Sequence, residues 1–173
     1  MTRTLARSVG RSLGWIALGA ALLSLPCADV LAQSADPDPV KLFDEGNALY
    51  REGNLAAAEA KFQQSFDLKP VYDTAANLGD CEINVGQFRD AAEHLSYAAR
   101  NFPASGEAEI RAQLESRLRQ ALAKVGALTI QPSVPGAAIA VDGTKIGLSP
   151  LERDIYVEPG THSISATKDG YER

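Results

Sequence analysis

Apolar residues recur at helical spacing through the middle of the chain. In the first such segment Leu42, Gly46 and Leu49 fall on related faces, which is the three- and four-residue step of an amphipathic helix. Gly53 then ends one helix and Pro70 must follow the end of the next. The same pattern of apolar steps and breaks predicts five helices, over residues 40–50, 55–68, 72–84, 88–101 and 105–125.

The helical region contains an internal repeat with an offset of 33 residues. Six positions match between the two units: Gly46 with Gly79, Gly53 with Gly86, Leu55 with Phe88, Ala58 with Ala91, Phe62 with Leu95, and Pro70 with Pro103. The units cover residues 40–70 and 71–103, and each is predicted to be a helix, a turn and a second helix. A period of this length indicates stacked helical hairpins that bury a continuous core.

These matched positions resemble the tetratricopeptide repeat (TPR) family. The resemblance is carried by the glycine of each first helix, the alanine and the larger apolar residue of each second helix, and the final proline: Gly46, Ala58, Phe62, Pro70, Gly79, Ala91, Leu95 and Pro103. Small residues let the two helices of a hairpin approach closely. The resemblance implies a protein that binds a peptide or a partner helix on the concave face of its first helices.

On that concave face we expect the binding residues to be Asn47, Tyr50, Asp80 and Asn84. Some TPR proteins clamp a peptide carboxylate with lysine and asparagine on their first helices, and Asn47 matches one such asparagine. The equivalent position of the second unit is Asp80, whose charge would repel a carboxylate. A clamp lysine is not evident, so we do not expect a carboxylate clamp.

A repeat pair leaves an apolar edge, which residues 105–125 are expected to cover as a capping helix. Ser105 can cap the start of this helix, and Ile110 and Leu114 belong to one apolar stripe along it. The helix also carries three arginines, which either line a peptide groove or, in the favoured interpretation, form a solvated face: Arg111, Arg117 and Arg119.

After Gly126 the pattern changes to the two-residue alternation of strands. Strands are predicted over residues 128–131, 137–141, 145–147, 154–157 and 161–167. Asp142-Gly143 is a hairpin signal, and in the last strand Ile164 and Ala166 alternate with polar residues. The fold class is therefore α+β, with helical repeats and a small antiparallel β domain at residues 127–173 as separate modules.

The β segment resembles the PEGA domain, a small β module of bacterial envelope and surface proteins. The resemblance rests on a series of turn and strand blocks in the expected order: Pro135-Gly136-Ala137, Val141-Asp142-Gly143, Ile146-Gly147, Pro150-Leu151, Pro159-Gly160-Thr161-His162 and Gly170-Tyr171. The module ordinarily continues into at least one further strand. The favoured interpretation is therefore that the sequence is incomplete. The alternative is a sheet with an open edge for a partner.

The first residues read as a targeting segment. Arg3, Arg7 and Arg11 precede an uncharged apolar run over residues 13–25, which is shorter than the roughly 20 residues of a membrane span. We predict a secretory signal peptide over residues 1–32, cleaved after Ala32, and a linker over 33–39. The protein is then periplasmic or secreted in a bacterium. The alternative is an uncleaved segment that anchors it to the membrane.

Composition and charge exclude several classes of protein. Of the 173 residues, 17 are basic and 22 acidic, for a formal net charge of −5, which is unlike a nucleic-acid binder. Cleavage would leave Cys81 as the lone cysteine, which is either half of an intermolecular disulfide or, in the favoured interpretation, a buried thiol. His94 and His162 lie in different modules, so we expect no metal, no cofactor and no enzyme activity.

The sequence thus predicts a non-enzymatic interaction scaffold of the cell envelope. Its helical repeats would bind a peptide or partner helix, and its β module would attach to envelope or surface components. One alternative is an envelope polysaccharide binder that uses exposed aromatic residues of the β module, Tyr156 and Tyr171. The other is a structural subunit of a larger envelope complex. We do not expect the protein to bind nucleic acid. If the signal peptide is cleaved, we also expect no stable transmembrane span.

Overall fold

The computed structural model describes residues 37–171 of the chain. The predicted signal peptide, its cleavage point and most of the linker lie outside the described residues. Among the described residues, no helix combines the length and the apolar character needed to cross a membrane.

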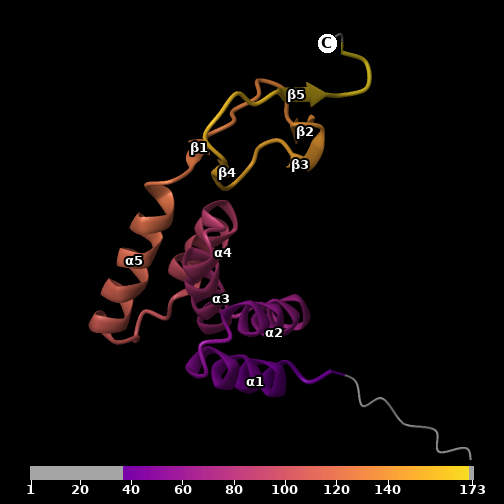
Figure 1. The fold of residues 1–173 in the computed structure, drawn as a ribbon. Helices are drawn as coiled ribbons and strands as arrows, with labels where there is room; N and C mark the ends of the chain where they lie inside the picture. Colours follow the sequence, from indigo (N-terminus) through magenta and orange to yellow (C-terminus); the bar gives the residue numbers. More distant parts are fainter. Residues whose placement is uncertain (1–36, 172–173) are drawn as a thin grey trace, which may run out of the picture. The chain divides into compact units, whose positions relative to one another are not determined.

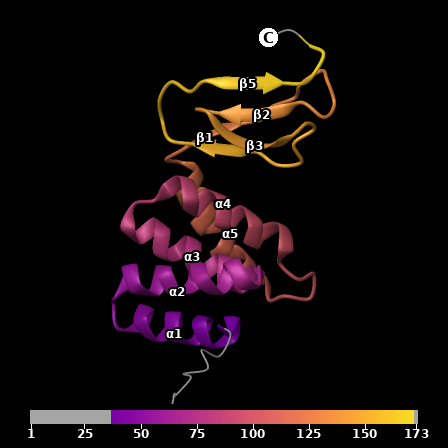
Figure 2. The same cartoon turned by 90° about the vertical axis from the view of Figure 1, so that its right-hand side faces the viewer.

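Five α-helices form the first part of the described chain (Figure 1): α1 (Pro39–Arg51), α2 (Leu55–Leu68), α3 (Tyr72–Val85), α4 (Phe88–Asn101) and α5 (Ala108–Leu122). The first four agree with the predicted ranges to within one residue at each end. Each helix packs against the one before it, and Figure 2 shows α1 to α4 lying side by side in chain order. The arrangement is that of two stacked helical hairpins followed by a fifth helix.

Close approach within each hairpin depends on the two predicted glycines. A Cβ atom on Gly46 would lie 2.7 Å from the ring of Phe62, and one on Gly79 would lie 2.5 Å from Leu95 Cγ. Phe62 and Leu95 are each 1% exposed. The structure therefore confirms that the small residue on each first helix lets the two helices approach closely, and it places a large apolar side chain of the second helix against that residue.

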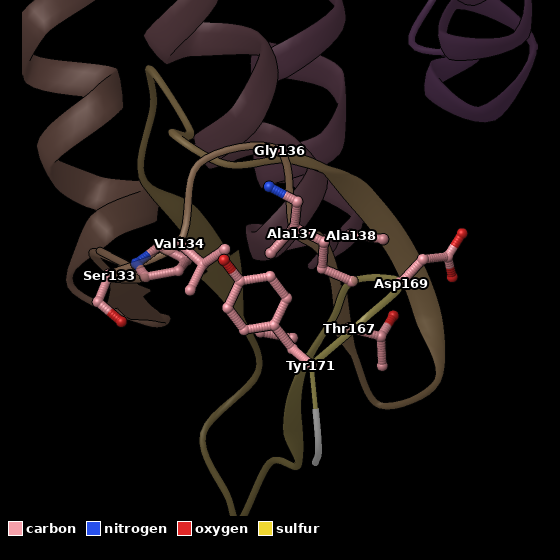
Figure 3. A pocket seen from close by; sticks show the side chains of 11 residues that line it. Ser133, Val134, Gly136, Ala137, Ala138, Thr167, Asp169 and Tyr171 are labelled. Atoms are coloured by element: carbon pink, nitrogen blue, oxygen red, sulfur yellow. The ribbon is translucent and has the colours of Figure 1, made fainter.

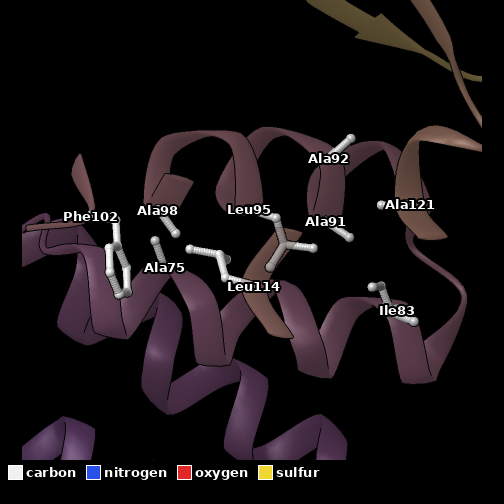
Figure 4. Close-up of a cluster of buried hydrophobic side chains, with 9 residues drawn as sticks. All are labelled: Ala75, Ile83, Ala91, Ala92, Leu95, Ala98, Phe102, Leu114 and Ala121. Carbon is white, nitrogen blue, oxygen red and sulfur yellow. The ribbon is translucent and has the colours of Figure 1, made fainter. Parts of the chain in front are cut away.

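The larger of the two buried clusters in the described helices is made largely of small side chains, which lets the helices stack closely. Four of its nine buried members come from α4, and the rest come from α3, α5 and the loop between α4 and α5 (Figure 4): Ala75, Ile83, Ala91, Ala92, Leu95, Ala98, Phe102, Leu114 and Ala121. The core thus runs from the second hairpin into α5, as expected for a capping helix.

Two details of the predicted capping helix are wrong. The helix begins at Ala108 with Glu107 as its N-cap residue, so Ser105 does not cap it. Ile110, predicted to join the buried stripe, is 46% exposed. The reason is Phe102, which is buried and packs closely against Gly106. Its ring fills the core at this end of α5, and the first turn of the helix is left outside.

Five short antiparallel strands form the second module: β1 (Gly126–Leu128), β2 (Ala138–Val141), β3 (Thr144–Leu148), β4 (Ile155–Val157) and β5 (Ile164–Thr167). They make two sheets, one of β1 and β4 and one in the order β3-β2-β5. At the hairpin between β2 and β3, Asp142 and Gly143 both have positive φ, 50° and 79°. Two consecutive residues of this kind make a primed turn, so the hairpin prediction is confirmed.

The first and last strands differ from their predictions. β1 ends at Leu128, three residues before the predicted end, and beyond it the Thr129 hydroxyl donates to Asp154 Oδ1 at 2.8 Å. β5 is exposed at every position, including Ile164, which is 50% exposed. Among the described elements β5 pairs only with β2, so nothing covers the face that alternation predicted to be buried.

Candidate functional site

The four residues predicted for the concave face lie on α1 and α3, and three of them meet. The Tyr50 hydroxyl donates a hydrogen bond to Asp80 Oδ2. Asn84 Nδ2 donates to the Asp80 carbonyl oxygen at 2.8 Å and lies 3.4 Å from its carboxylate. Asn47 lies apart from this group, and its Oδ1 accepts a hydrogen bond from Asn77 Nδ2 at 3.3 Å. The face therefore presents two neighbouring polar groups bridging α1 and α3.

Arg117 of α5 completes the group around Asp80. Its Nε lies 2.7 Å from Asp80 Oδ1, so the two side chains form an ion pair. The two atoms do not meet the geometry of a hydrogen bond. Arg117 lies on an exposed face, as the favoured sequence interpretation placed it, but the structure also gives it a charged partner, Asp80, that the sequence did not reveal. One signal was available: α5 follows the repeats as a further first helix would, so its side chains meet those of α3.

The charge of Asp80 is therefore not free to repel a ligand as the sequence argument assumed. Arg117 supplies a positive charge, and its side chain remains 45% exposed. The hydrogen bond to Asp80, together with burial, raises the pKa of Tyr50 to about 12. Tyr50 thus stays protonated and keeps its donor fixed on Asp80 at physiological pH. The result is a preset polar surface with a guanidinium at its border.

An apolar cavity of about 480 Å³ lies further along the same two helices, toward their N-terminal ends. Its apolar lining includes Val40 and Phe43 of α1 and Tyr72 of α3. Three charged residues also line it: Asp44, Lys69 and Asp73. Val40 is 61% exposed. Phe43 precedes Tyr50 by two helical turns, so the cavity and the polar group are about 10 Å apart along α1.

The residues with catalytic potential are buried in structural roles. Cys81 is fully buried, as predicted, and burial raises the pKa of its thiol to about 12. It is therefore not a thiolate at neutral pH. His94 is paired with Glu82 between α3 and α4. No group of metal-binding side chains occurs among residues 37–171.

Comparison with known proteins agrees with this architecture. Residues 125–173 match the family model of the PEGA domain. The chain is also similar to tetratricopeptide repeat protein 16 of Mus musculus, with 31% identity over 113 residues, and of Macaca fascicularis, with 38% identity over 69 residues. These matches cover 57% and 35% of this chain but 15% and 8% of the relatives, so the chain spans a small part of their length.

The chain joins TPR-like repeats to a PEGA domain. Five helices followed by a small antiparallel sheet fit that combination. It is a combination typical of proteins that act by binding other proteins, in families that are generally non-enzymatic.

The two tyrosines singled out in the PEGA domain have different surroundings. Tyr156 on β4 is half-buried, packs against the helical core, and its hydroxyl lies 2.7 Å from Ser96 Oγ of α4. It is therefore not an exposed stacking surface. Tyr171 is 61% exposed and lines a cavity. Among the described residues, Tyr171 and Tyr156 line different cavities, so they do not form one site.

His162 of the PEGA domain should titrate at a higher pH than an ordinary histidine. Its Nδ1 lies 2.6 Å from Asp142 Oδ2 and its Nε2 lies 2.6 Å from the Glu158 carbonyl oxygen. Both ring nitrogens face acceptor oxygens. Only the protonated ring carries an N–H on each nitrogen, so only this form can donate a hydrogen bond to both oxygens. The Asp142 hydrogen bond, followed by the Glu158 carbonyl, raises the pKa of His162 above 6.5.

An NMR titration of the imidazole resonances tests this prediction. Asp142→Asn should lower the pKa of His162 because the anionic acceptor is lost. Glu158→Gln is the matched control, because residue 158 accepts mainly through its backbone and the pKa should change little. A pKa at or below 6.5 in the wild type would contradict the geometry.

Proposed function

We propose that the protein is a non-enzymatic scaffold of the bacterial cell envelope. In this proposal the concave face of the TPR-like helices binds a peptide or partner helix, and the PEGA domain attaches the assembly to envelope or surface components. The predicted signal peptide supports a periplasmic or secreted location. An uncleaved N-terminal segment would instead anchor the same scaffold to the membrane.

One observation carries the binding role: the polar group around Asp80 and the apolar cavity lie along the same two first helices. An apolar side chain of a ligand fits the cavity beside Phe43. Polar groups of the ligand then reach Tyr50 and Arg117, which are held in place by Asp80. A span of about 10 Å corresponds to three residues of an extended peptide or two turns of a helix.

A library of displayed random peptides tests this role. Peptides selected on the full chain should lose binding to Val40→Glu and to Asn47→Arg, since both changes alter the concave face at side chains outside the core. Gln64→Arg, on an exposed position of α2, is the matched control and should bind as the wild type does. Selected peptides that bind all three variants equally would exclude the concave face as the binding site.

Two alternatives concern the PEGA domain and the assembly. As a structural subunit of a larger envelope complex, the protein would pack its repeats on a homologous chain, and a monomer in light scattering would count against this role. As an envelope polysaccharide binder, it would use the PEGA domain. The exposed aromatic ring of Tyr171 is the observation that favours this second role.

A further inference from the structure

The PEGA domain contains a cavity of about 780 Å³ between the loop at residues 132–137 and the segment at residues 166–171 (Figure 3). This volume lies within the range of small-molecule binding sites. Figure 3 shows the Tyr171 ring reaching across the opening toward Val134. The cavity therefore has an aromatic ring on one wall and an irregular loop on the other.

The loop is fixed by buried Ser149, although it has no regular secondary structure. Ser149 Oγ donates to the Val134 carbonyl at 2.6 Å and accepts from the Ala137 amide at 3.0 Å. The Gly136 amide donates to the Ser149 carbonyl at 2.7 Å. From the other wall, Lys168 Nζ donates to the Pro135 carbonyl at 2.7 Å. Binding would thus not require the loop to become ordered.

Polar side chains that have no partner among the described residues surround the aromatic ring. Ser133, Thr167 and Asp169 line the cavity, and their side chains make no hydrogen bond or ion pair with any residue of the described part of the chain. Lys168 is different, because its ammonium group is bonded to Pro135 and lies 5.6 Å from the centroid of the Tyr171 ring. The cavity is therefore lined by one ammonium group, of Lys168, and one carboxylate, of Asp169, so these two charges balance and favour a neutral ligand over an ionic one.

We infer that this cavity binds a neutral sugar residue of a glycan. A sugar ring has an apolar face of C–H groups that fits against the Tyr171 ring, and a rim of hydroxyls. The rim donates to Asp169 and exchanges hydrogen bonds with Ser133 and Thr167. This inference deepens the attachment role proposed for the PEGA domain, and it is independent of peptide binding on the concave face.

An NMR titration of the full chain with neutral oligosaccharides tests the inference. The probes are tetrasaccharides of N-acetylglucosamine, glucose and mannose, and a tetrasaccharide of uronic acid is the anionic control. At least one neutral probe should shift the amide resonances of residues 133–138 and 166–171, and the uronic acid probe should bind more weakly. A peptide that adds to the edge of β5 is the competing occupant, and a random peptide library is screened in parallel.

Three variants separate the contributions. Tyr171→Ala should weaken binding of the neutral probe by about tenfold or more, a loss of about 1.4 kcal/mol, whereas Tyr171→Phe should retain binding because the ring remains. Asp169→Asn should weaken binding several-fold. Tyr156→Phe, the matched control on the half-buried tyrosine, should bind as the wild type does.

The inference is overturned if no neutral probe shifts these amides, if the uronic acid binds best, or if Tyr171→Ala binds unchanged. It is also overturned if only peptides occupy the cavity. Selection of peptides on the concave face is measured in the same preparations. If no peptide binds the concave face but a sugar binds the cavity, the TPR role is refuted and the sugar site stands. If peptides bind but no sugar does, the sugar site is refuted and the TPR role stands.

Discussion

Replacing His94 with glutamine is expected to lower the free energy of unfolding by about 3–5 kcal/mol. Glu82 of α3 is 2% exposed, and both of its carboxylate oxygens lie 2.9 Å from Nδ1 of His94 on α4. In the variant the carboxylate would remain buried without a counter-charge. Urea unfolding of the full chain at neutral pH measures the difference.

The double variant Glu82→Gln/His94→Gln controls for loss of the ring itself. It removes both charges and keeps groups that can hydrogen-bond, so it should recover most of the stability lost in His94→Gln. If the double variant is as unstable as the single one, the cost lies in packing, since the edge of the Phe66 ring also meets the His94 ring with centroids 5.3 Å apart.

The same pair predicts the sign of the pH dependence. Burial alone would lower the pKa of His94, but the hydrogen bond and charge of Glu82 outweigh it, so the pKa is raised. Burial also raises the pKa of Glu82, against the effect of His94. Both groups hold protons more tightly when folded, so the stability they contribute should fall as the pH rises above 6.5 through the folded pKa of His94. The double variant should lack this decline.

Gly79→Ala is expected to destabilise the protein by about 1–2 kcal/mol. Overpacking costs about 1–3 kcal/mol, because the new methyl group would lie 2.5 Å from Leu95 Cγ in the core. Higher helix propensity offsets up to about 1 kcal/mol of this cost. The measurement is again urea unfolding, with the slope checked to confirm that the unfolding transition is unchanged.

A double-mutant cycle with Leu95→Ala shows whether the two residues share one space. Leu95→Ala alone should cost about 2–5 kcal/mol because it leaves a cavity. In the double variant the added methyl group occupies part of that cavity, so the combined loss should be clearly smaller than the sum of the two. Additive losses would contradict the predicted contact between Gly79 and Leu95.

Residue patterns located the helices well because each hairpin depends on local periodicity and on a few fixed contacts. The offset of 33 matched Gly46 with Gly79 and Phe62 with Leu95, and the TPR resemblance placed each glycine beside the apolar residue of its own hairpin. The hairpin at Asp142-Gly143 followed from its own turn chemistry. Such features involve residues whose conformation or neighbour is set within one repeat or one turn.

The interactions that sequence reasoning missed join parts of the chain that lie far apart. Arg117 reaches Asp80 across 37 positions, and the pattern of α5 alone cannot show which arginine faces α3. The full exposure of β5 depends on its place in the sheet order, which alternation within one strand does not reveal. Phe102 displaced Ile110 from the core for the same reason, because a loop residue competed for the space.

The contact between Arg117 and Asp80 ties α3 to α5, the helix that leads directly into the PEGA domain. The first strand of the PEGA domain follows α5 after a short connection, so tension applied to this domain pulls on α5 through the chain. A second route runs through Tyr156 to Ser96 on α4. If α5 shifts under load, the guanidinium leaves the concave face and its polar surface changes. Under the proposed binding role, the affinity of the TPR-like helices for a peptide would then depend on the tension applied to the PEGA domain.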